Sequence, residues 1–375
     1  MKAKKEQWLI CIAFCAFLGI MMGLFLALPK ENYSEIEKKY LAEAPEISFE
    51  NILSGNLDDE LELYISEHLP GRSFFVGVNA YFSLLTGRQI ASDIYFAQGE
   101  RLVEKPVSPD ADNLAKKEEA IRNFAKTVGQ GVDVMIIPSA GWAAQEQIQG
   151  IADPYGDAEI LAGIYERLSG KVNPISVTEL YRNRPDLYYR TDHHWTTEGA
   201  YQAYRAYLQS KHRTCREQTD FSVETVDGFY GSTYSRAALW LTKPDTLELW
   251  TGTENLQVTA QKPGSKVPVQ HDGVFYRERL TEADKYTVYL DGNNSLVRIE
   301  NPNGKGKLLV IRDSYVNCLG PLLAESYETV VLVDLRYFDI MKPVSELCAE
   351  ENFDDILICY SIGNFISDTN LTILR

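Results

Sequence analysis

The sequence predicts an α/β protein built on a doubly wound parallel sheet, with a membrane-spanning helix at the N-terminus and a β-rich insertion. After residue 107, helical segments alternate with short apolar strands, which is typical of a parallel sheet covered by helices on both faces. The 375 residues are 45% apolar and 24% charged, as in an average folded protein that is long enough for a sizeable core. This composition excludes an intrinsically disordered chain and a small disulfide scaffold.

The first thirty residues predict a membrane anchor. An uncharged apolar run extends from Trp8 to Leu28, and as a helix it would span the roughly 30 Å hydrocarbon core of a bilayer. The rival interpretation is a cleaved signal peptide, whose apolar region would be about 7–15 residues long with small residues at the exit. Residues 25–29 make a poor cleavage site, so we favour an uncleaved anchor over residues 1–30. Lysines at positions 2, 4 and 5 favour a cytoplasmic N-terminus, which places the chain after Lys30 outside the cell membrane.

Charge and cysteine usage exclude several classes of partner. The formal charge of −16, from 37 basic and 53 acidic residues, disfavours general nucleic-acid binding because phosphate backbones are repelled. The six cysteines include no CxxC pair and no Cys/His cluster at zinc spacing, so neither a structural metal nor another cofactor is expected. Four of them would lie outside the membrane and allow three full pairings, among which the sequence does not choose: Cys215, Cys318, Cys348 and Cys359.

Residues 31–107 predict a juxtamembrane region of amphipathic helices. Pro70-Gly71 would separate two such helices, and short β-like segments follow them. We expect the helices at Leu57–Leu69 and Ser73–Leu85, and the strands at Ile94–Phe96 and Arg101–Val103.

Residues 108–375 carry the alternating pattern of the predicted sheet. A helix with a charged face leads into the apolar strand Val132–Ile137, which Pro138 ends. A stretch rich in Gly, Thr and Tyr at about 215–301 interrupts the alternation, and we interpret it as an insertion. The helices are expected at Asn113–Val128, after Asp157, from Thr196 and at Tyr315–Ser326, and the other strands at Ile175–Val177, Lys307–Ile311, Thr329–Leu335 and Ile356–Tyr360.

The segment Asp192-His193-His194-Trp195 is the first candidate for catalysis. The chain has only five histidines, and two of them stand beside an aspartate at a strand-to-helix junction. A carboxylate two residues before an imidazole can fix its tautomer and stabilise the imidazolium that forms when it takes a proton. Thr196 or Thr197 would cap the following helix, and the small Gly199-Ala200 pair would let that helix pack closely. The alternative is a polar turn with a helix cap, in which the histidines are incidental.

Ser314 is the second candidate, because it lies between an apolar strand and a helix. This geometry points a hydroxyl at the strand end and surrounds it with free N–H donors of the first helical turn, which an oxyanion needs. The alternative is that Asp313 or Ser314 only caps the helix. Together with Asp192 and His194, however, the serine completes a Ser-His-Asp set.

Other polar residues follow strands at the edge where doubly wound sheets bind ligands. Asn317 lies one turn beyond Ser314, and Asn364 follows the last strand. Either amide could complete an oxyanion hole, or lie in an exposed helix turn or loop. Arg312 and Arg336 could meet an acyl or sugar group, although surface salt bridges are the simpler role.

The order of these motifs resembles that of the DHHW proteins, relatives of the alginate O-acetylation enzymes within the SGNH hydrolase-like group. The resemblance rests first on Asp192-His193-His194-Trp195 and Asp313-Ser314-Tyr315, and it covers nearly the whole external chain. It implies an SGNH-like, flavodoxin-like fold of circularly permuted order, with the Asp/His element before the serine. Further matching segments are Leu69–Arg72, Ile94–Phe96, Ile137–Ser139, Asp227–Gly231 and Val333–Phe338.

The resemblance also implies residue roles, with Ser314 as nucleophile, His194 as base and Asp192 as its orienting carboxylate. Gly199, five positions after His194, matches a His-Pro-x-x-x-Gly pattern of the wider group and so selects His194 over His193 as the base. His193 is then a structural or substrate-contacting neighbour. The chain departs from the group's usual pattern at Arg312, which stands in place of a glycine, and in the shortened Asp-x-His spacing.

The function implied by the resemblance is acyl transfer outside the membrane. An O-acetyltransferase would move an acetyl group through an acetyl-serine to an exported or cell-wall polysaccharide. A membrane-bound O-acyltransferase partner would supply the acetyl group. An O-acetyl esterase would use the same residues with water as acceptor. A non-catalytic polysaccharide-binding or scaffold protein is a further alternative, since 22 tyrosines and five tryptophans could line a glycan groove. A metal-dependent phosphoesterase would need more carboxylates near the Asp-His-His motif than the spacing provides.

Overall fold

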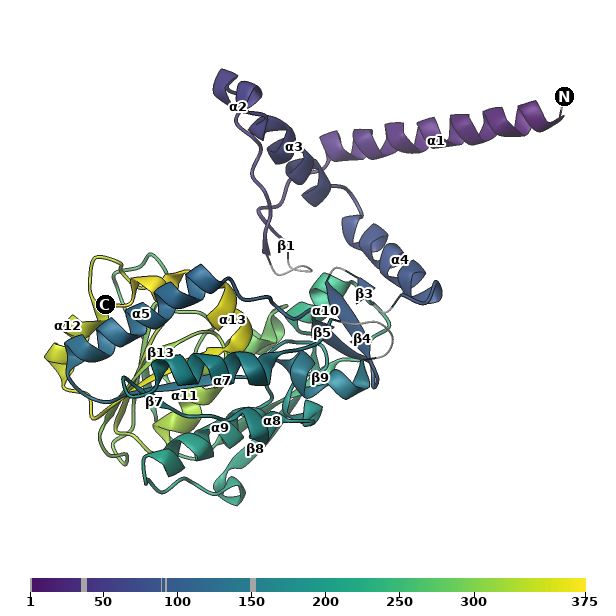
Figure 1. The fold of residues 1–375 in the computed structure, drawn as a ribbon. Helices are drawn as coiled ribbons and strands as arrows, with labels where there is room; N and C mark the ends of the chain where they lie inside the picture. The colour runs from purple at the N-terminus through teal and green to yellow at the C-terminus, as the bar shows by residue number, and fades with distance from the viewer. Residues whose placement is uncertain (1, 35–38, 89, 92, 149–152) are drawn as a thin grey trace. The chain divides into compact units, whose positions relative to one another are not determined.

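The structure is a computed structural model that describes residues 2–34, 39–88, 90–91, 93–148 and 153–375. It divides into two compact units. The first comprises Met1–Gly87 with Ser235–Trp240, and the second comprises Arg88–Tyr234 with Leu241–Arg375 (Figure 1). Asp192, His194 and Ser314 all belong to the second unit.

The first unit is mainly helical. The predicted amphipathic helices are confirmed as α3 and α4, and Gly71, in the left-handed region at φ 70°, precedes α4 and separates the two. One helix of the described chain contains a segment, Gln7–Ala27, that is long and apolar enough to cross a membrane. The elements are α1 (Lys2–Ala27), β1 (Tyr33–Ser34), β2 (Lys39–Tyr40), α2 (Phe49–Ser54), α3 (Asn56–Glu67) and α4 (Arg72–Leu85).

The second unit is built on an eight-stranded mixed sheet in the order β11-β10-β12-β14-β13-β15-β6-β7. The five strands from β14 to β7 are parallel. β14, β13, β15 and β6 are buried almost throughout, whereas the two residues of β7 are exposed. The strands are β6 (Val132–Ile137), β7 (Asn173–Pro174), β10 (Gln257–Gln261), β11 (Val269–Asp272), β12 (Leu296–Glu300), β13 (Lys307–Arg312), β14 (Thr329–Val333) and β15 (Asp355–Ser361).

The prediction of a wholly parallel sheet is wrong for three strands. β12, β10 and β11 continue the sheet in antiparallel fashion beside β14, and all three come from the segment interpreted as an insertion. In β10 buried and more exposed residues alternate, as in antiparallel strands with one covered face, so this strand lacks the continuous apolar run of a parallel strand. The rest of that segment includes the separate antiparallel pair β8 (Ser222–Phe229) and β9 (Asp245–Thr251).

Helices cover both faces of the sheet, as predicted. α9 and α11 share one apolar core with Leu308 and Val310 of β13, whereas α5, α7, α12 and α13 share another with Leu309 and Ile311 of the same strand. The alternation follows from the strand period of two residues. The helices are α5 (Ala111–Val128), α6 (Ala140–Ala143), α7 (Asp157–Leu168), α8 (Thr178–Tyr181), α9 (Thr197–Ser210), α10 (Ser232–Ala237), α11 (Val316–Ala324), α12 (Val344–Glu351) and α13 (Ile362–Ser367).

Smaller elements complete the chain. The predicted β-like segments before residue 107 form a three-stranded sheet of β3 (Ile90–Ala91), β4 (Ile94–Ala97) and β5 (Arg101–Glu104). The strand predicted at Ile175–Val177 is displaced, because β7 ends at Pro174 and only the Ile175 N–H continues to the Val134 carbonyl. The six cysteines are free thiols in the described chain. The domain boundaries predicted at residues 30 and 107 stay predictions.

Candidate active site

The histidine segment lies directly before α9. Thr196 is the N-cap of this helix, and its side chain accepts a hydrogen bond from the Gly199 N–H at 3.2 Å, which confirms one of the two predicted caps. Gly199 lies so close to the preceding loop that a Cβ atom there would fall 2.3 Å from the Leu187 carbonyl oxygen. The cap and the close approach together fix the direction in which the chain enters the helix, and thereby the place of His194.

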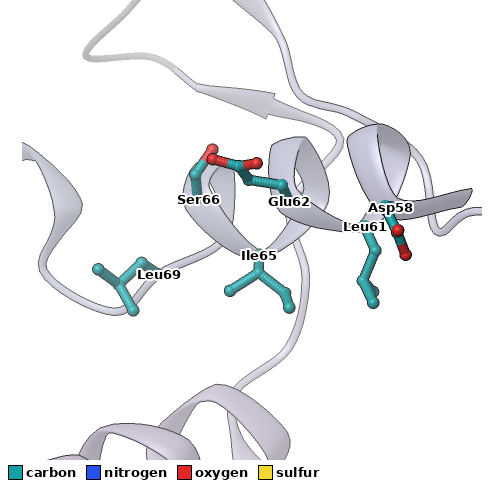
Figure 2. Close-up of a pocket in the computed structure, with 6 residues that line it drawn as sticks. All are labelled: Asp58, Leu61, Glu62, Ile65, Ser66 and Leu69. Atoms are coloured by element: carbon teal, nitrogen blue, oxygen red, sulfur yellow. The ribbon is translucent and has the colours of Figure 1, made fainter. Parts of the chain in front are cut away.

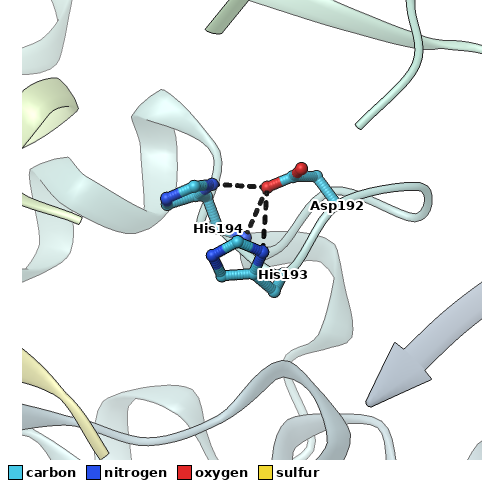
Figure 3. A group of neighbouring side chains, drawn as sticks. All are labelled: Asp192, His193 and His194. Atoms are coloured by element: carbon cyan, nitrogen blue, oxygen red, sulfur yellow. Dashed lines mark hydrogen bonds and ion pairs between the residues drawn. The ribbon is translucent and has the colours of Figure 1, made fainter. Parts of the chain in front are cut away.

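Asp192, His194 and Ser314 form one hydrogen-bonded series. His194 Nδ1 lies 2.5 Å from Asp192 Oδ1, and His194 Nε2 lies 2.9 Å from Ser314 Oγ. Figure 3 shows the carboxylate of Asp192 beside the ring of His194. All three side chains are buried, with Ser314 at 8% exposure. The arrangement can accept the serine proton on one ring nitrogen while the other donates to the carboxylate.

Ser232 holds the second oxygen of Asp192. Its backbone N–H and its hydroxyl both donate to Asp192 Oδ2, at 2.6 and 3.0 Å. The residue before it, Gly231, leaves no room for a side chain, because a Cβ there would lie 2.1 Å from the Cβ of Asp192. The Asp227–Gly231 segment singled out in the sequence therefore packs against the carboxylate.

His193 makes a different set of contacts from those of His194. Its Nδ1 lies 2.8 Å from Ser232 Oγ and 3.7 Å from Asp192 Oδ1. Since the single Ser232 hydroxyl proton goes to Asp192, His193 Nδ1 must donate to Ser232 Oγ. His194 thus contacts Ser314, whereas His193 contacts Asp192 through Ser232. The roles of base and neighbour stay predictions.

The ring of His194 lies between two other rings. His193 lies 4.0 Å away on centroids at 35°, and Tyr286 stacks at 4.0 Å and 15°. Tyr286 is buried, and its hydroxyl has no hydrogen-bond partner in the described structure. Sequence reasoning missed Tyr286, because it lies in the irregular segment at 215–301 where no periodicity points to a buried face.

Two hydrogen bonds join the histidine segment to the serine segment beside the reacting groups. Trp195 Nε1 donates to the Tyr315 carbonyl at 3.0 Å, and the Tyr315 hydroxyl donates to the His193 carbonyl at 2.5 Å. Each bond joins a neighbour of His194 to the neighbour of Ser314. The distance between His194 and Ser314 is therefore fixed by the hydrogen bonds of their neighbours as well as by their own contact.

Asp313 anchors the turn that presents Ser314. Its Oδ1 accepts from the Tyr315 N–H at 3.0 Å, and its Oδ2 accepts from the Ser361 N–H, the Ser361 hydroxyl and the Asn364 amide at 2.7–2.9 Å. The Asn364 amide, predicted as an oxyanion donor, is thus engaged with Asp313. These bonds tie the end of β13 to the end of β15.

The expected set of free N–H donors after Ser314 is not present. The N–H groups of Tyr315, Val316 and Asn317 all bond within the tight turn, to Asp313 Oδ1, the Asp313 carbonyl and the Ser314 carbonyl. Acceptors of Asp313 and Ser314 therefore already occupy these three N–H groups. None of the hydrogen bonds described for this turn is donated by the Ser314 N–H.

Arg312 is fully buried and contacts internal groups instead of an open surface. Its guanidinium donates to Asn317 Oδ1 at 2.7 Å and lies 3.7 Å from Asp334, which also pairs with Arg336. Asn317 in turn donates to Asn293 at 3.3 Å. A buried network behind Ser314 thus engages the side chains of Arg312 and Asn317, and their contacts with substrate stay predictions.

Burial and charge set the protonation of the pair. Burial lowers the pKa of His194 from its ordinary 6.5, and the charge of His193 lowers it further, although Asp192 opposes the shift. For Asp192, burial alone would raise the pKa, but the charges of the two histidines and the hydrogen bonds from His194 hold it well below its ordinary value. At neutral pH the site therefore holds a neutral imidazole beside an ionised carboxylate.

Asp192, His193 and His194 form a group in the described chain whose side chains could bind a metal ion. Their donor atoms are already used among protein groups: His194 Nδ1 bonds Asp192, and His193 Nδ1 bonds Ser232. This is the pattern of a proton-transfer pair, and it leaves few donors for a metal.

The fold and the site define a class of mixed α/β proteins in which an aspartate, a histidine and a serine form one hydrogen-bonded series, with the serine just beyond the end of β13. The chain matches the DHHW protein family over residues 115–333, more than half of its length, and it belongs to that family. The resemblance noted in the sequence is thereby confirmed.

Solved structures show where the fold has been seen before. A DHHW family protein from Eubacterium siraeum aligns with a TM-score of 0.65 at 21% identity, covering 76% of this chain and 95% of its own. Bacillus cereus PatB1 with a sulfonyl adduct aligns with a TM-score of 0.63 at 20% identity, and the alignment covers 75% of this chain and 98% of PatB1. The O-acetyltransferase domain of Pseudomonas putida AlgJ is more distant, with a TM-score of 0.44 at 12% identity. This alignment covers 73% of this chain and 92% of the AlgJ domain. No significant match is found among curated protein sequences.

Proposed function

We propose that this protein is a membrane-anchored O-acetyltransferase that modifies an exported or cell-wall polysaccharide outside the cell membrane. The observation that carries the proposal is the series Asp192–His194–Ser314, with contacts of 2.5 and 2.9 Å between the reacting groups. Membership of the DHHW family supports it. The sulfonyl adduct of PatB1 is a further support, because sulfonyl groups attach to nucleophilic side chains. An O-acetyl esterase is the second candidate, since the same residues serve when water is the acceptor.

In the proposed mechanism, His194 Nε2 accepts the Ser314 proton as the serine oxygen attacks the carbonyl of an acetyl donor. Asp192 stabilises the imidazolium, and the Ser314 N–H is the proposed donor to the oxyanion. The leaving group departs with the proton from His194, which leaves an acetyl-serine. A sugar hydroxyl then gives its proton to His194 and attacks the acetyl group, and the serine is restored.

Fold order and membrane placement form part of the same proposal. The Asp/His element precedes the serine by 120 positions, which supports a circularly permuted SGNH-like arrangement. α1 is proposed as an uncleaved anchor with its N-terminus inside, which the length of Gln7–Ala27 supports. Acetyl groups would then come from a membrane-bound O-acyltransferase partner, because a single helix cannot carry them across the bilayer.

The decisive experiment traps the intermediate on the full chain in detergent. A labelled acetyl ester is added, the reaction is quenched in acid, and peptides are examined by mass spectrometry. We expect the label on Ser314 and its faster release when an oligosaccharide acceptor is present, with acetylated sugar as product. Release at the same rate with or without the sugar would favour the esterase. Turnover with the label on another residue would remove Ser314 from the mechanism.

The pH dependence of ester turnover should report the lowered pKa of His194. A base with a lowered pKa stays unprotonated to lower pH, so kcat/KM should be flat near neutrality and fall only below pH 6.5. Replacing His193 with glutamine removes a charge that lowers this pKa, while an amide can still bond Ser232. The acid limb of His193→Gln should therefore move to higher pH. A limb that stays in place or moves down would contradict this assignment of the charge effect.

Tyr286 allows the stacked ring to be tested separately from its hydroxyl. Because the hydroxyl is buried without a partner, Tyr286→Phe should keep turnover and should not lower the free energy of unfolding. Tyr286→Leu removes the ring against His194 and should lower kcat about tenfold or more, because the imidazole loses a positioning contact. Turnover and thermal unfolding of both variants provide the comparison. Equal kcat in Tyr286→Leu and the parent would show that the stack does not position the base.

A further inference from the structure

Helix α4 exposes its large apolar residues and buries its small ones. Phe74, Val78, Phe82 and Leu85 follow helical spacing along one face, and Phe82 and Leu85 are 63% and 86% exposed. The buried residues of the helix are Gly77, Ala80 and Ser83. A helix of a water-soluble protein has the opposite arrangement, with its large apolar residues toward the core. The outward face is therefore suited to an apolar environment.

Packing within the first unit fixes this orientation. A Cβ at Gly77 would lie 2.1 Å from the ring of Trp240, so the small face of α4 is in close contact with that side chain. Phe74 stacks on the same ring at 5.6 Å and 9°. Turning the large residues inward would replace Gly77 with a bulky side chain at a place that has no room for one.

The neighbouring helices extend the apolar surface. Figure 2 shows Leu61, Ile65 and Leu69 directed to the same side of α3, away from Glu62 and Ser66. Large exposed apolar residues continue on α2, where Phe49 is 77% exposed. Exposed large apolar residues on three successive helices indicate an interaction surface rather than ordinary surface variation.

Position in the chain and contacts to α1 identify what covers this surface. Phe75 of α4 meets Phe17 of α1 at 6.3 Å, and Tyr64 of α3 meets Phe25 at 6.1 Å, both edge to face. α1 is the helix proposed to cross the membrane. If lipid surrounds α1, then the residues of α3 and α4 that contact the rings of α1 lie next to the same lipid.

Charge favours a lipid surface at α4 in particular. No acidic residue occurs between Glu67 and Asp93, whereas Arg72 and Arg88 stand at the two ends of the helix. Positive side chains can extend to lipid phosphates while the apolar stems and rings stay in the acyl region. The aromatic content of the exposed face is typical of helices that bind membranes from one side.

We propose that α4 lies in the outer leaflet of the bilayer that α1 crosses, with Phe74, Val78, Phe82 and Leu85 directed into the acyl chains. This inference rests on the proposed membrane anchor and extends it from one helix to a second point of attachment. The second unit begins at Arg88, three residues after the end of α4.

The test uses the full chain in vesicles of phosphatidylcholine and phosphatidylglycerol, with p-benzoylphenylalanine in place of one residue at a time. Phe82 tests α4, Phe17 tests α1, and Val223 of β8 is the matched control, since it is apolar and 47% exposed in the second unit. After irradiation, intact mass shows whether lipid is attached. We expect lipid adducts at Phe82 and Phe17 and none at Val223.

Each other outcome has a distinct meaning. A lipid adduct at Phe17 with none at Phe82, or a Phe82 adduct to protein, overturns the inference and leaves the anchor in place. An adduct at Phe82 alone removes the anchor and keeps the membrane contact of α4. Adducts at neither position overturn both, and an adduct at Val223 as strong as that at Phe82 shows that contact with lipid is not specific to α4.

A second measurement needs no photochemistry. With a protease site inserted between Lys30 and Glu31, cleavage on the vesicles separates α1 from the rest of the chain. The released part should stay on the vesicles, and Phe82→Asp should lower its partition coefficient about tenfold or more, because a large ring no longer enters lipid. Val223→Asp should leave the partition unchanged. Equal retention of both variants would overturn the inference.

Discussion

Replacement of Ser314 by alanine is expected to abolish acetyl-enzyme formation and to lower ester turnover by a factor on the order of 10⁴–10⁶. The Ser314 hydroxyl is the group that His194 Nε2 contacts, at 2.9 Å, and without it no oxygen is placed to attack the acetyl carbonyl. The fold should persist, because the N-cap residue of α11 is Tyr315 and the serine supplies no cap bond. Turnover, mass spectrometry of the trapped peptide and thermal unfolding measure the three expectations.

Ser367→Ala is a suitable control for this variant, since Ser367 is an exposed serine on α13 that bonds only a carbonyl of its own helix. It should match the parent in turnover and stability. If Ser314→Ala retains the turnover of the control, the nucleophile is another group and the proposed mechanism is wrong.

The two adjacent histidines should respond very differently to alanine. His194→Ala removes the base and should be nearly as damaging as Ser314→Ala, and combining the two should add little because they act as one unit. His193→Ala removes the contact with Ser232 but leaves the contact of His194 with Ser314, so measurable turnover should remain, with mainly altered KM. Steady-state kinetics of the three variants and the double variant provide the test.

The reverse order would overturn the assignment. If His193→Ala is inactive and His194→Ala is active, the register argument from Gly199 fails and the role of Asp192 must be reassigned as well. A double variant far worse than either single one would show that Ser314 and His194 act in separate steps.

The sequence was most informative where local pattern and chemistry coincide. The buried parallel strands β6, β13 and β15 are continuous apolar runs, so they could be recognised without a structure. The Asp192–His194 pair could be recognised as well, because the carboxylate lies only two residues before the imidazole. The contact of Asp192 and His194 with Ser314 could not be read from the strand pattern, because the segment directly before Asp192 belongs to no strand of the eight-stranded sheet.

What the sequence did not reveal depends on contacts between distant segments. Tyr286 stacks on His194 from 92 positions away in an irregular stretch, and Ser232 reaches Asp192 from beyond β8. The engagement of Asn364 by Asp313 could not be foreseen, because an amide after a strand has the same local pattern whether it bonds a substrate or a neighbour. The antiparallel strands were hidden for the same reason, since their alternation of burial is also that of a solvent-facing hairpin.

The 120 positions between His194 and Ser314 have a consequence during synthesis of the chain on the ribosome. A ribosome adds about 5–20 residues per second, so the serine follows the histidine by roughly 6–24 s. During that interval the nascent chain holds a base and its carboxylate with nothing to activate. The hydrogen bonds from Trp195 and Tyr315 that join the two segments cannot form either. Under the proposed mechanism, a chain that ends before Ser314 lacks the nucleophile, and acyl transfer begins only after the serine segment has been made and has folded against the histidine segment.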